Sequence, residues 1–256
     1  MKVAAVIPCR WGSRRFPGKS LAPILGRPMV AWVVDAARHA RRVQQVIVAT
    51  DDDRIAQAAS QAGAEVRMTS STHPTGTDRV AEAVRDLAVD VVLGIQGDEP
   101  MIHPTSIDAL AEVFQDREVQ LATLAIRGAT EEERNDPHLA KIVVDDRGDA
   151  LYFSRAAIPF RNLAAGCKPL APGQKDLDTW RHVGSYGFRK DTLLGLVREP
   201  RIGFEAAEDL EQLRALRLGW KIRIVEIQED PICVDLPEDL ARVESILKAR
   251  REESLR

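Results

Sequence analysis

Apolar runs typical of strands alternate with amphipathic patterns typical of helices through the first half of this sequence, and this alternation constrains the fold most. Successive parallel strands need crossover connections, which helices of this length supply with a right-handed sense. The sequence therefore predicts an α/β fold with a mostly parallel sheet and helices on both faces. The expected strands are Val3–Ile7, Gln45–Thr50, Glu65–Met68, Val91–Gln96 and Leu121–Ile126, and the expected helices are Pro28–Ala40, Asp53–Ala62, Thr77–Leu87 and Pro104–Gln115.

The pattern changes after Ile126, where the segments Ala140–Val144 and Ala150–Phe153 flank a turn-forming stretch typical of a hairpin. We expect one domain over residues 1–256, with an inserted α+β lobe at about 130–189 that covers the active site or forms a subunit interface. A polar segment, Asn162–Asp178, is expected to be a surface loop of this lobe. The remaining expected elements are the strands His182–Phe188 and Ile222–Glu226 and the helices Asp191–Arg198, Glu208–Arg217 and Pro237–Arg250.

The composition excludes several classes of protein. A formal net charge of −3 with mixed signs gives no electrostatic footprint for nucleic acid or an anionic membrane. The three cysteines, Cys9, Cys167 and Cys233, are odd in number and lack metal-ligand spacing, so neither a disulfide framework nor a zinc site is indicated. No signal-peptide core and no apolar stretch of transmembrane length is present. We therefore expect a cytoplasmic protein.

The loop after the first strand is rich in glycine and cationic residues, as loops that bind polyphosphates are. Gly18-Lys19-Ser20 resembles the end of a Walker A motif, but five residues separate Gly12 from Gly18 where that motif has four. No helix is expected at Lys19 either, because prolines and a glycine follow closely. The alternative is a surface turn with solvated charges. A strand-loop-helix context favours phosphate binding, because ligands of open α/β sheets bind beyond the carboxyl ends of strands.

Two aspartates follow apolar segments and are candidate metal ligands. Asp98 lies in Gln96-Gly97-Asp98-Glu99-Pro100 after a strand, and Asp235 directly precedes the last helix. Mg²⁺ usually takes one or two protein carboxylates and completes its shell with water and phosphate. The alternatives are a simple turn at Asp98 and a helix cap at Asp235. The segment from Thr75 to Arg79 adds small hydroxyl residues and an arginine at a helix start, which suit an anion or a base.

Polar clusters in the second half are ambiguous. His182 and Tyr186 share one face of an expected strand, where partly buried packing is more common than chemistry. Glu211 with Arg214 suits an exposed helix stabilised by charge pairs. Both interpretations stay open on the residues alone.

Taken together and in order, these segments resemble the 3-deoxy-D-manno-octulosonate (Kdo) cytidylyltransferase family. The opening motif is shared with other nucleotidyltransferases, including CMP-sialic acid synthetases, whereas the later motifs are more specific. The resemblance rests on Ile7-Pro8-Cys9-Arg10 through Phe16-Pro17-Gly18-Lys19, Gln96-Gly97-Asp98-Glu99-Pro100, Leu151-Tyr152-Phe153-Ser154-Arg155 with Ile158-Pro159, Arg181-His182 to Tyr186-Gly187, Leu210-Glu211-Gln212-Leu213-Arg214, and Val234-Asp235 with Pro237-Glu238-Asp239.

The resemblance implies a Rossmann-like fold of the nucleotide-diphospho-sugar transferase type, in a homodimer. It also implies transfer of CMP from CTP to the anomeric hydroxyl of Kdo, with Mg²⁺, for lipopolysaccharide synthesis. By the family pattern Arg10, Lys19 and Asp98 are catalytic, and Asp98 and Asp235 hold the metal. The nucleotide-binding residues so implied are Arg10, Ser13, Arg15, Lys19, Thr75, Gly76, Thr77, Arg79 and Gln96, and the sugar-binding residues are Gln96, Arg155, His182, Tyr186, Glu211 and Gln212.

Two alternatives remain at this stage. One keeps the chemistry and changes the acceptor to a sialic acid or to 8-amino-Kdo. The other is a protein that senses CTP without turnover, although a sensor has no need of the metal-binding aspartates Asp98 and Asp235.

Overall fold

The computed structural model describes residues 1–13 and 15–254, and the chain divides into two compact units. The first unit combines Met1–Glu112 with Glu229–Arg256, so the chain leaves this unit once and returns to it. The second unit is the continuous segment Val113–Gln228, which extends on both sides beyond the insertion expected at about 130–189. The added length consists of strands and helices that flank the expected lobe.

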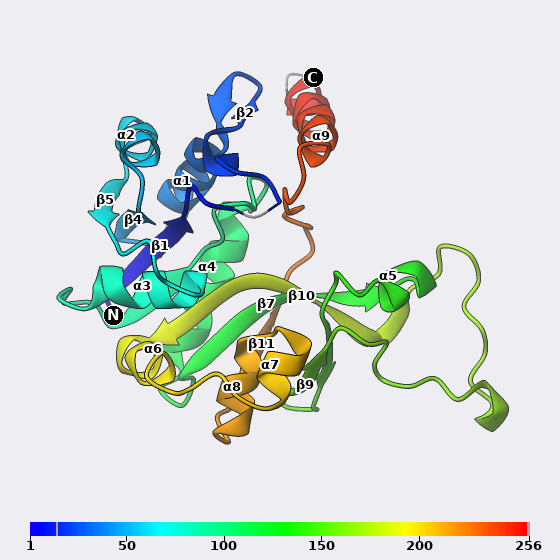
Figure 1. The fold of residues 1–256 in the computed structure, drawn as a ribbon. Helices are drawn as coiled ribbons and strands as arrows, with labels where there is room; N and C mark the ends of the chain where they lie inside the picture. The colour runs from blue at the N-terminus through cyan, green and yellow to red at the C-terminus, as the bar shows by residue number, and fades with distance from the viewer. Residues whose placement is uncertain (14, 255–256) are drawn as a thin grey trace. The chain divides into compact units, whose positions relative to one another are not determined.

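Four parallel strands form the sheet of the first unit, in the spatial order β6-β1-β4-β5. Strand β1 is apolar along its length and buried from Val3 to Ile7, as expected for a strand covered on both faces. The elements of this unit, most of them labelled in Figure 1, are β1 (Val3–Cys9), the 3₁₀ helix η1 (Lys19–Leu21), β2 (Pro23–Ile24), β3 (Arg27–Pro28), α1 (Met29–His39), β4 (Gln45–Thr50), α2 (Asp53–Gln61), β5 (Glu65–Met68), α3 (Gly76–Val84), β6 (Val91–Gly94), α4 (Pro104–Glu112) and α9 (Asp239–Ser254).

The strand order places the helices on both faces of this sheet. The chain moves in one direction from β1 to β4 and β5, then returns past β1 to β6. Right-handed crossovers therefore put α1 and α2 on one face and α3 on the other. Consistent with this, α1 packs against α2 and α4, whereas α3 packs against β1, β4 and β6. The order reverses between β1 and β6, and ligands of such sheets bind beyond the strand ends at that point.

The returning C-terminal segment completes the core of the first unit. Val234 and Val243 are fully buried in a cluster with Ile24 and Met29. The Glu244 carboxylate accepts a hydrogen bond from the Leu25 amide at 2.7 Å, which ties α9 to the β2 hairpin. The segment that carries Asp235 is therefore fixed by packing against residues more than two hundred positions earlier.

The second unit is built on antiparallel pairs with one parallel addition. The long strand β10 pairs antiparallel with β7 and with β8, and β11 pairs parallel with β7. The expected hairpin is confirmed, with β8 and β9 joined by a turn in which Gly148 has φ +81°. The elements are the 3₁₀ helix η2 (Val113–Gln115), β7 (Leu121–Ala129), α5 (Glu131–Asn135), β8 (Lys141–Val144), β9 (Ala150–Ser154), the 3₁₀ helix η3 (Leu163–Ala165), β10 (Asp176–Arg189), α6 (Lys190–Leu196), α7 (Phe204–Glu208), α8 (Gln212–Arg217) and β11 (Arg223–Glu226).

The single helix expected at Glu208–Arg217 is wrong, because the structure has two short helices there. Helix α7 ends at Glu208, and Asp209 caps it in the left-handed conformation with φ 53° and ψ 47°. Helix α8 then begins at Gln212, so Glu211 stands at the N-cap position and not within a helix. The expected surface loop at 162–178 is confirmed as a largely exposed segment up to Lys175, but its last three residues belong to strand β10, which begins at Asp176.

No helix in the part of the chain that the structure describes is long and apolar enough to cross a membrane. The longest, α9, has 16 residues and carries charged side chains along its length.

Candidate active site

The loop after β1 has a fixed backbone. The amides of Ser13 and Gly18 both donate to the Trp11 carbonyl, each at 2.9 Å. Gly18 has φ +72°, and a Cβ there would stand 2.8 Å from the Trp11 ring, so this position requires glycine. The Arg54 guanidinium stacks over the Trp11 ring, with its Cζ 3.4 Å from the ring centroid. The loop therefore presents its cationic side chains from a defined position.

Lys19, at the end of this loop, is surrounded by oxygens from two other segments. Its Nζ donates to Asp98 Oδ2, to the Val234 carbonyl at 3.2 Å and to Asp235 Oδ1 at 3.4 Å. Arg15 adds a second cation, with Nη2 2.8 Å from Asp235 Oδ1. The Val234 amide donates to the Asp98 carbonyl at 2.8 Å and so holds the two acidic segments together. The structure thus joins two cations and both candidate metal ligands in one cluster.

The electrostatics of this cluster favour the protonated, positively charged form of Lys19. Burial lowers the pKa of Lys19, but the charge of Asp98 and its hydrogen bond to the ammonium outweigh burial, and the pKa lies above its ordinary value. Lys19 is therefore charged at neutral pH. Asp98, Cys233 and Asp235 each offer a ligand atom, all within 4.8 Å of one another, and form the only such group in the described part of the chain. Two carboxylates that already hold an ammonium also fit a divalent cation.

Tight backbone packing brings the end of β6 against the end of β1. A Cβ at Gly97 would stand 2.6 Å from Cys9 Sγ and 3.0 Å from the Pro8 carbonyl oxygen, so Asp98 follows a position that requires glycine. The Cys9 thiol is inert here, because burial raises its pKa to about 12 against the opposing hydrogen bond with Ser20.

The start of α3 reaches the same strand end. A Cβ at Gly76 would lie 3.3 Å from the Pro8 ring and 3.7 Å from Gln96 Oε1, so these two nucleotide-site candidates are neighbours. Thr75, not Thr77, is the N-cap of α3, and its hydroxyl accepts from the Asp78 amide at 3.2 Å. The first turn of α3 therefore begins beside this strand end, and helix first turns carry amides without intrahelical partners.

The other first-unit candidates divide between buried supports and exposed groups. Arg79 is buried and donates to Thr69 Oγ1 at 2.6 Å and to Asp51 Oδ2 at 3.0 Å, so its guanidinium braces α3 against the loop after β4. Asp51 also accepts from the Trp11 amide at 3.3 Å and links this brace to the cationic loop. Thr77 and Ser13 are buried, and Arg10 is exposed directly after β1.

In the second unit His182 and Tyr186 are in ring contact, with centroids 5.3 Å apart, and Tyr186 is hydrogen-bonded to the buried Gln212. His182 Nε2 lies 2.9 Å from Thr123 Oγ1, and its ring packs edge-on against Phe153. Burial, followed by the charge of Arg155, lowers the pKa of His182 to about 3, so the imidazole is neutral. The Tyr186 hydroxyl donates to Gln212 Oε1 at 2.9 Å, and Gln212 Nε2 is buried without a partner among the described residues.

Arg155 is held differently, by backbone carbonyls. Its Nε donates to the Glu208 carbonyl at 2.8 Å and its Nη1 to the Pro137 carbonyl at 3.1 Å. The Glu208 carboxylate accepts from the Arg155 amide at 2.9 Å and from Ser154 Oγ at 2.6 Å. Arg155 therefore fixes the junction between β9 and α7. Glu211, at the start of α8, is half-buried.

Two participants were missed from the sequence. Glu208 fastens Arg155, and nothing in its sequence context distinguishes it from a surface glutamate. Cys233 belongs to the aspartate cluster, although the cysteines lack metal-ligand spacing among themselves. The available signal was its position two residues before Asp235, since alternate residues of an extended segment face the same side.

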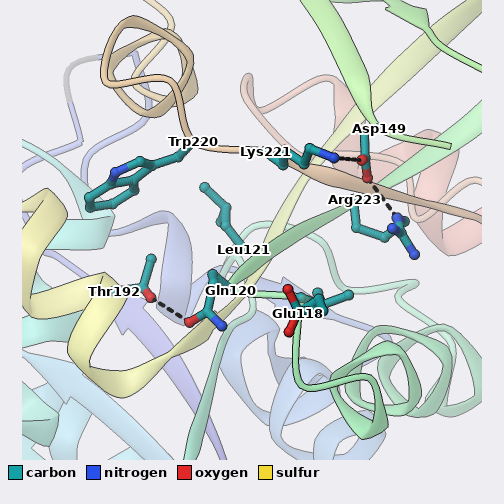
Figure 2. A pocket seen from close by; sticks show the side chains of 9 residues that line it. Glu118, Gln120, Leu121, Asp149, Thr192, Trp220, Lys221 and Arg223 are labelled. Atoms are coloured by element: carbon teal, nitrogen blue, oxygen red, sulfur yellow. Dashed lines mark hydrogen bonds and ion pairs between the residues drawn. The ribbon is translucent and has the colours of Figure 1, made fainter. Parts of the chain in front are cut away.

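A separate cavity of about 460 Å³ lies within the second unit and contains none of the expected site residues. Figure 2 shows Asp149 between Lys221 and Arg223 on one wall, and Gln120 bonded to Thr192 on another. It is lined by Glu118, Val119, Gln120, Leu121, Asp149, Thr192, Trp220, Lys221 and Arg223.

Comparison with known proteins defines the class first. A family model described as cytidylyltransferase matches residues 4–224. This span contains the cationic loop, the start of α3 and Asp98. The fold and this match make the chain a nucleotidyltransferase of the cytidylyltransferase class.

Relatives define the family within this class. The 3-deoxy-manno-octulosonate cytidylyltransferase of Geobacter metallireducens is 45% identical over 95% of this chain and 96% of its own length. That of an Anaeromyxobacter species is 47% identical over 97% and 98%. The solved structure of CMP:2-keto-3-deoxy-manno-octonic acid synthetase complexed with CTP has a TM-score of 0.89 and 37% identity, covering 98% of this chain and 100% of its own. The chain belongs to the 3-deoxy-manno-octulosonate cytidylyltransferase family, and the expected fold class is confirmed.

Proposed function

We propose that this protein transfers CMP from CTP to the anomeric hydroxyl of Kdo and releases pyrophosphate, as a step of lipopolysaccharide synthesis. The observation that carries the proposal is the cluster of Lys19, Arg15, Asp98 and Asp235 at the strand end where nucleotides bind in such folds. Its support is the membership of the whole chain in a family whose relatives carry the name of this reaction.

The nucleotide is bound by charge and by backbone amides. Arg10 and Lys19 bring positive charge to the triphosphate, and the first turn of α3 offers amides next to Gly76. Lys19 reaches phosphate only after it leaves Asp98 and Asp235, so nucleotide and metal binding are coupled through this side chain. Arg79 contributes by bracing α3 and the loop, rather than through a free guanidinium.

Asp98 and Asp235 are the proposed ligands of Mg²⁺, because their carboxylates already hold a cation and lie within ligand distance of each other. A bound Mg²⁺ supplies charge neutralisation across the phosphates and lowers the pKa of a nearby hydroxyl. The sugar oxygen attacks the α-phosphorus in line, the bond to the β-phosphate oxygen breaks, and the hydroxyl proton passes to solvent. Positioning and charge neutralisation by the chain's own cations account for most of the rate in such transfers.

The sugar acid is assigned to the polar residues His182, Tyr186 and Gln212 of the second unit. Gln212 Nε2 is a buried donor without a partner among the described residues, and a buried unsatisfied amide costs about 1–3 kcal/mol. A sugar hydroxyl that accepts from this amide recovers that cost, and an analogue without the hydroxyl does not. The Tyr186 hydroxyl holds the Gln212 side chain in place, and the neutral His182 is held by Thr123 and packs against the Tyr186 ring.

We also propose that the protein works as a homodimer in the cytoplasm, where CTP is available. The second unit exposes several large apolar side chains, among them Phe160, Leu163 and Leu177. A dimer interface that buried these side chains would remove them from water.

The deciding experiment is an assay of pyrophosphate release with CTP, Mg²⁺ and a panel of acceptors: Kdo, 8-amino-Kdo and a sialic acid. We expect turnover with Kdo, a product with the mass of CMP-Kdo, and far lower rates with the other acids. Binding of CTP without pyrophosphate release from any acceptor would indicate a sensor. Preference for another acid would overturn the assignment of Kdo while leaving the chemistry in place.

A further inference from the structure

Lys141 is a fully buried lysine of the second unit that the proposed mechanism does not use. It lies at the start of β8, and its Nζ donates to the carbonyls of Asp136 at 2.7 Å, Leu139 at 2.6 Å and Arg155 at 2.5 Å. These carbonyls accept every N–H that an ammonium group can donate. The ammonium therefore has no donor left for a ligand, and any effect it has on a substrate passes through the backbone that it binds.

The partners of Lys141 come from two segments of the second unit. Asp136 and Leu139 lie in the turn that connects α5 to β8, and Arg155 directly follows β9. A side chain that binds backbone carbonyls fixes the course of the chain at those residues. Lys141 therefore ties the turn at 136–139 to the main chain of Arg155.

The Arg155 side chain binds the other carbonyls of the same turn. Its Nη1 donates to the Pro137 carbonyl at 3.1 Å and to the His138 carbonyl at 3.3 Å, while its Nε donates to the Glu208 carbonyl at 2.8 Å. Among the described residues, Nη2 reaches only the Asp209 carbonyl, at 3.4 Å. Nη2 is therefore the nitrogen with a donor left for a ligand, and its direction depends on this turn.

The two cations at this turn are bound by neutral groups. In the part of the chain that the structure describes, the side chains of Lys141 and Arg155 donate to backbone carbonyls and form no ion pair. The Glu208 carboxylate binds the Arg155 amide and Ser154, not the guanidinium. Burial lowers the pKa of Lys141, the charge of Asp136 opposes this, and the charge of Arg155 adds to it. An acidic ligand suits a guanidinium placed in this way.

We propose that Lys141 is a positioning residue of the acceptor site, which fixes the main chain of Arg155 and the turn that directs its guanidinium towards the acid group of the sugar. The inference rests on the proposed function, with Arg155 as a sugar-binding residue, and adds a residue that touches neither substrate. The same segment also borders His182, whose amide donates to the Ala140 carbonyl at 2.9 Å. Loss of the ammonium leaves its carbonyls without this donor, so the turn has to rearrange.

The test is steady-state kinetics of pyrophosphate release with CTP, Mg²⁺ and Kdo. Lys141→Met keeps a long side chain and removes the N–H donors. We expect kcat/KM for Kdo to fall by at least about 10-fold, while the KM for CTP changes by less than about 2-fold. Leu193→Ala, at a fully buried position of α6, is the matched control for lost stability and should leave both KM values unchanged. An unchanged kcat/KM for Kdo in Lys141→Met, or a loss shared equally by Kdo and CTP, would overturn the proposal.

A double-mutant cycle separates positioning from general structural damage. Arg155→Lys keeps the charge but removes the planar group that the turn directs. Because Lys141 acts through Arg155, the loss of kcat/KM for Kdo in the double variant should be much smaller than the product of the two single losses. Single losses that multiply would refute the positioning role.

A second variant covers the case in which Lys141→Met does not fold, as judged by circular dichroism. Lys141→Gln keeps an amide donor at this position and should show the same selective loss for Kdo, smaller than that of the methionine variant. A loss in Lys141→Gln that extends equally to CTP would overturn the proposal.

The unmodified protein, measured alongside, distinguishes this inference from the proposed function. If it releases no pyrophosphate with any acceptor, the proposed function fails and the role of Lys141 fails with it. If it turns over Kdo normally and Lys141→Met shows no selective loss, only the role of Lys141 is refuted.

Discussion

At the scale of single residues, the candidate active site is organised around one ammonium group. Lys19 neutralises Asp98 and Asp235 in the absence of a metal, and its pKa stays high because these charges outweigh its burial. The arrangement lets two carboxylates stand close together before an ion arrives. Like charges so placed would otherwise raise the free energy of the folded state. The loop cation therefore holds the same two carboxylates that we propose as ligands of Mg²⁺.

The first prediction at this scale concerns those carboxylates. Asp98→Asn and Asp235→Asn should each reduce kcat for CMP transfer by at least about 100-fold, because the lost charge stabilisation is worth several kcal/mol. Initial rates over a range of Mg²⁺ concentrations measure the effect. Asp146→Asn, at an exposed hairpin turn, is the matched control and should behave as the unmodified protein. Near-normal turnover of either site variant at limiting Mg²⁺ would remove that residue from the metal site.

The second prediction follows from the buried imidazole of His182. Burial, aided by Arg155, lowers its pKa from 6.5 to about 3, so the unfolded chain binds the proton more readily between these values. The free energy of unfolding should therefore fall as pH drops below 6.5, and this one group accounts for about 2 kcal/mol between pH 7 and pH 5. Urea unfolding at both pH values measures the loss. His182→Gln should lose about 2 kcal/mol less over the same interval, and equal losses would contradict neutral burial.

At the scale of elements, short-range patterns predicted the parallel strands and most helices, but not where long polar helices break. The charged run at 208–217 has helical spacing, yet Asp209 adopts the left-handed conformation and divides it into α7 and α8. The reason is tertiary, because the Glu208 and Asp209 carbonyls accept from Arg155 at 2.8 and 3.4 Å, and Glu208 also binds Ser154. No local signal encodes these partners. Glu211 consequently leads α8 instead of lying within it.

The backbone conformation of Asp209 gives the element-scale prediction. A side chain at φ 53° costs roughly 1–2 kcal/mol relative to glycine. Asp209→Gly should therefore be more stable to thermal or urea unfolding than Asp209→Ala by about 1 kcal/mol. Both variants lose the exposed ion pair with Arg201, so their difference isolates the backbone. Equal stability of the two variants would show that α7 and α8 do not need the left-handed junction.

At the scale of the whole molecule, the sequence predicted the α/β class and the order of the site motifs, but not which residues meet. Asp98 and Asp235 were candidates from their places after strands, and their convergence depends on the return of the chain to the first unit through α9. Cys233 joins them by the same route. The second unit, Val113–Gln228, is longer than the lobe expected at about 130–189, because the strands β7 and β11 that complete its sheet look like any other α/β strand. Long-range packing carries this information.

The last prediction concerns assembly. Phe160 is 84% exposed in the second unit, and an isolated chain has little reason to leave so large an apolar side chain in water. If this surface forms a dimer, light scattering should give about twice the chain mass of 28.3 kDa. Phe160→Asp should shift the population towards the single-chain mass at equal concentration, because a buried unpaired carboxylate is costly. Met68→Asp, at an exposed apolar position of the first unit, should remain dimeric, and dissociation by that variant alone would place the interface on the other unit.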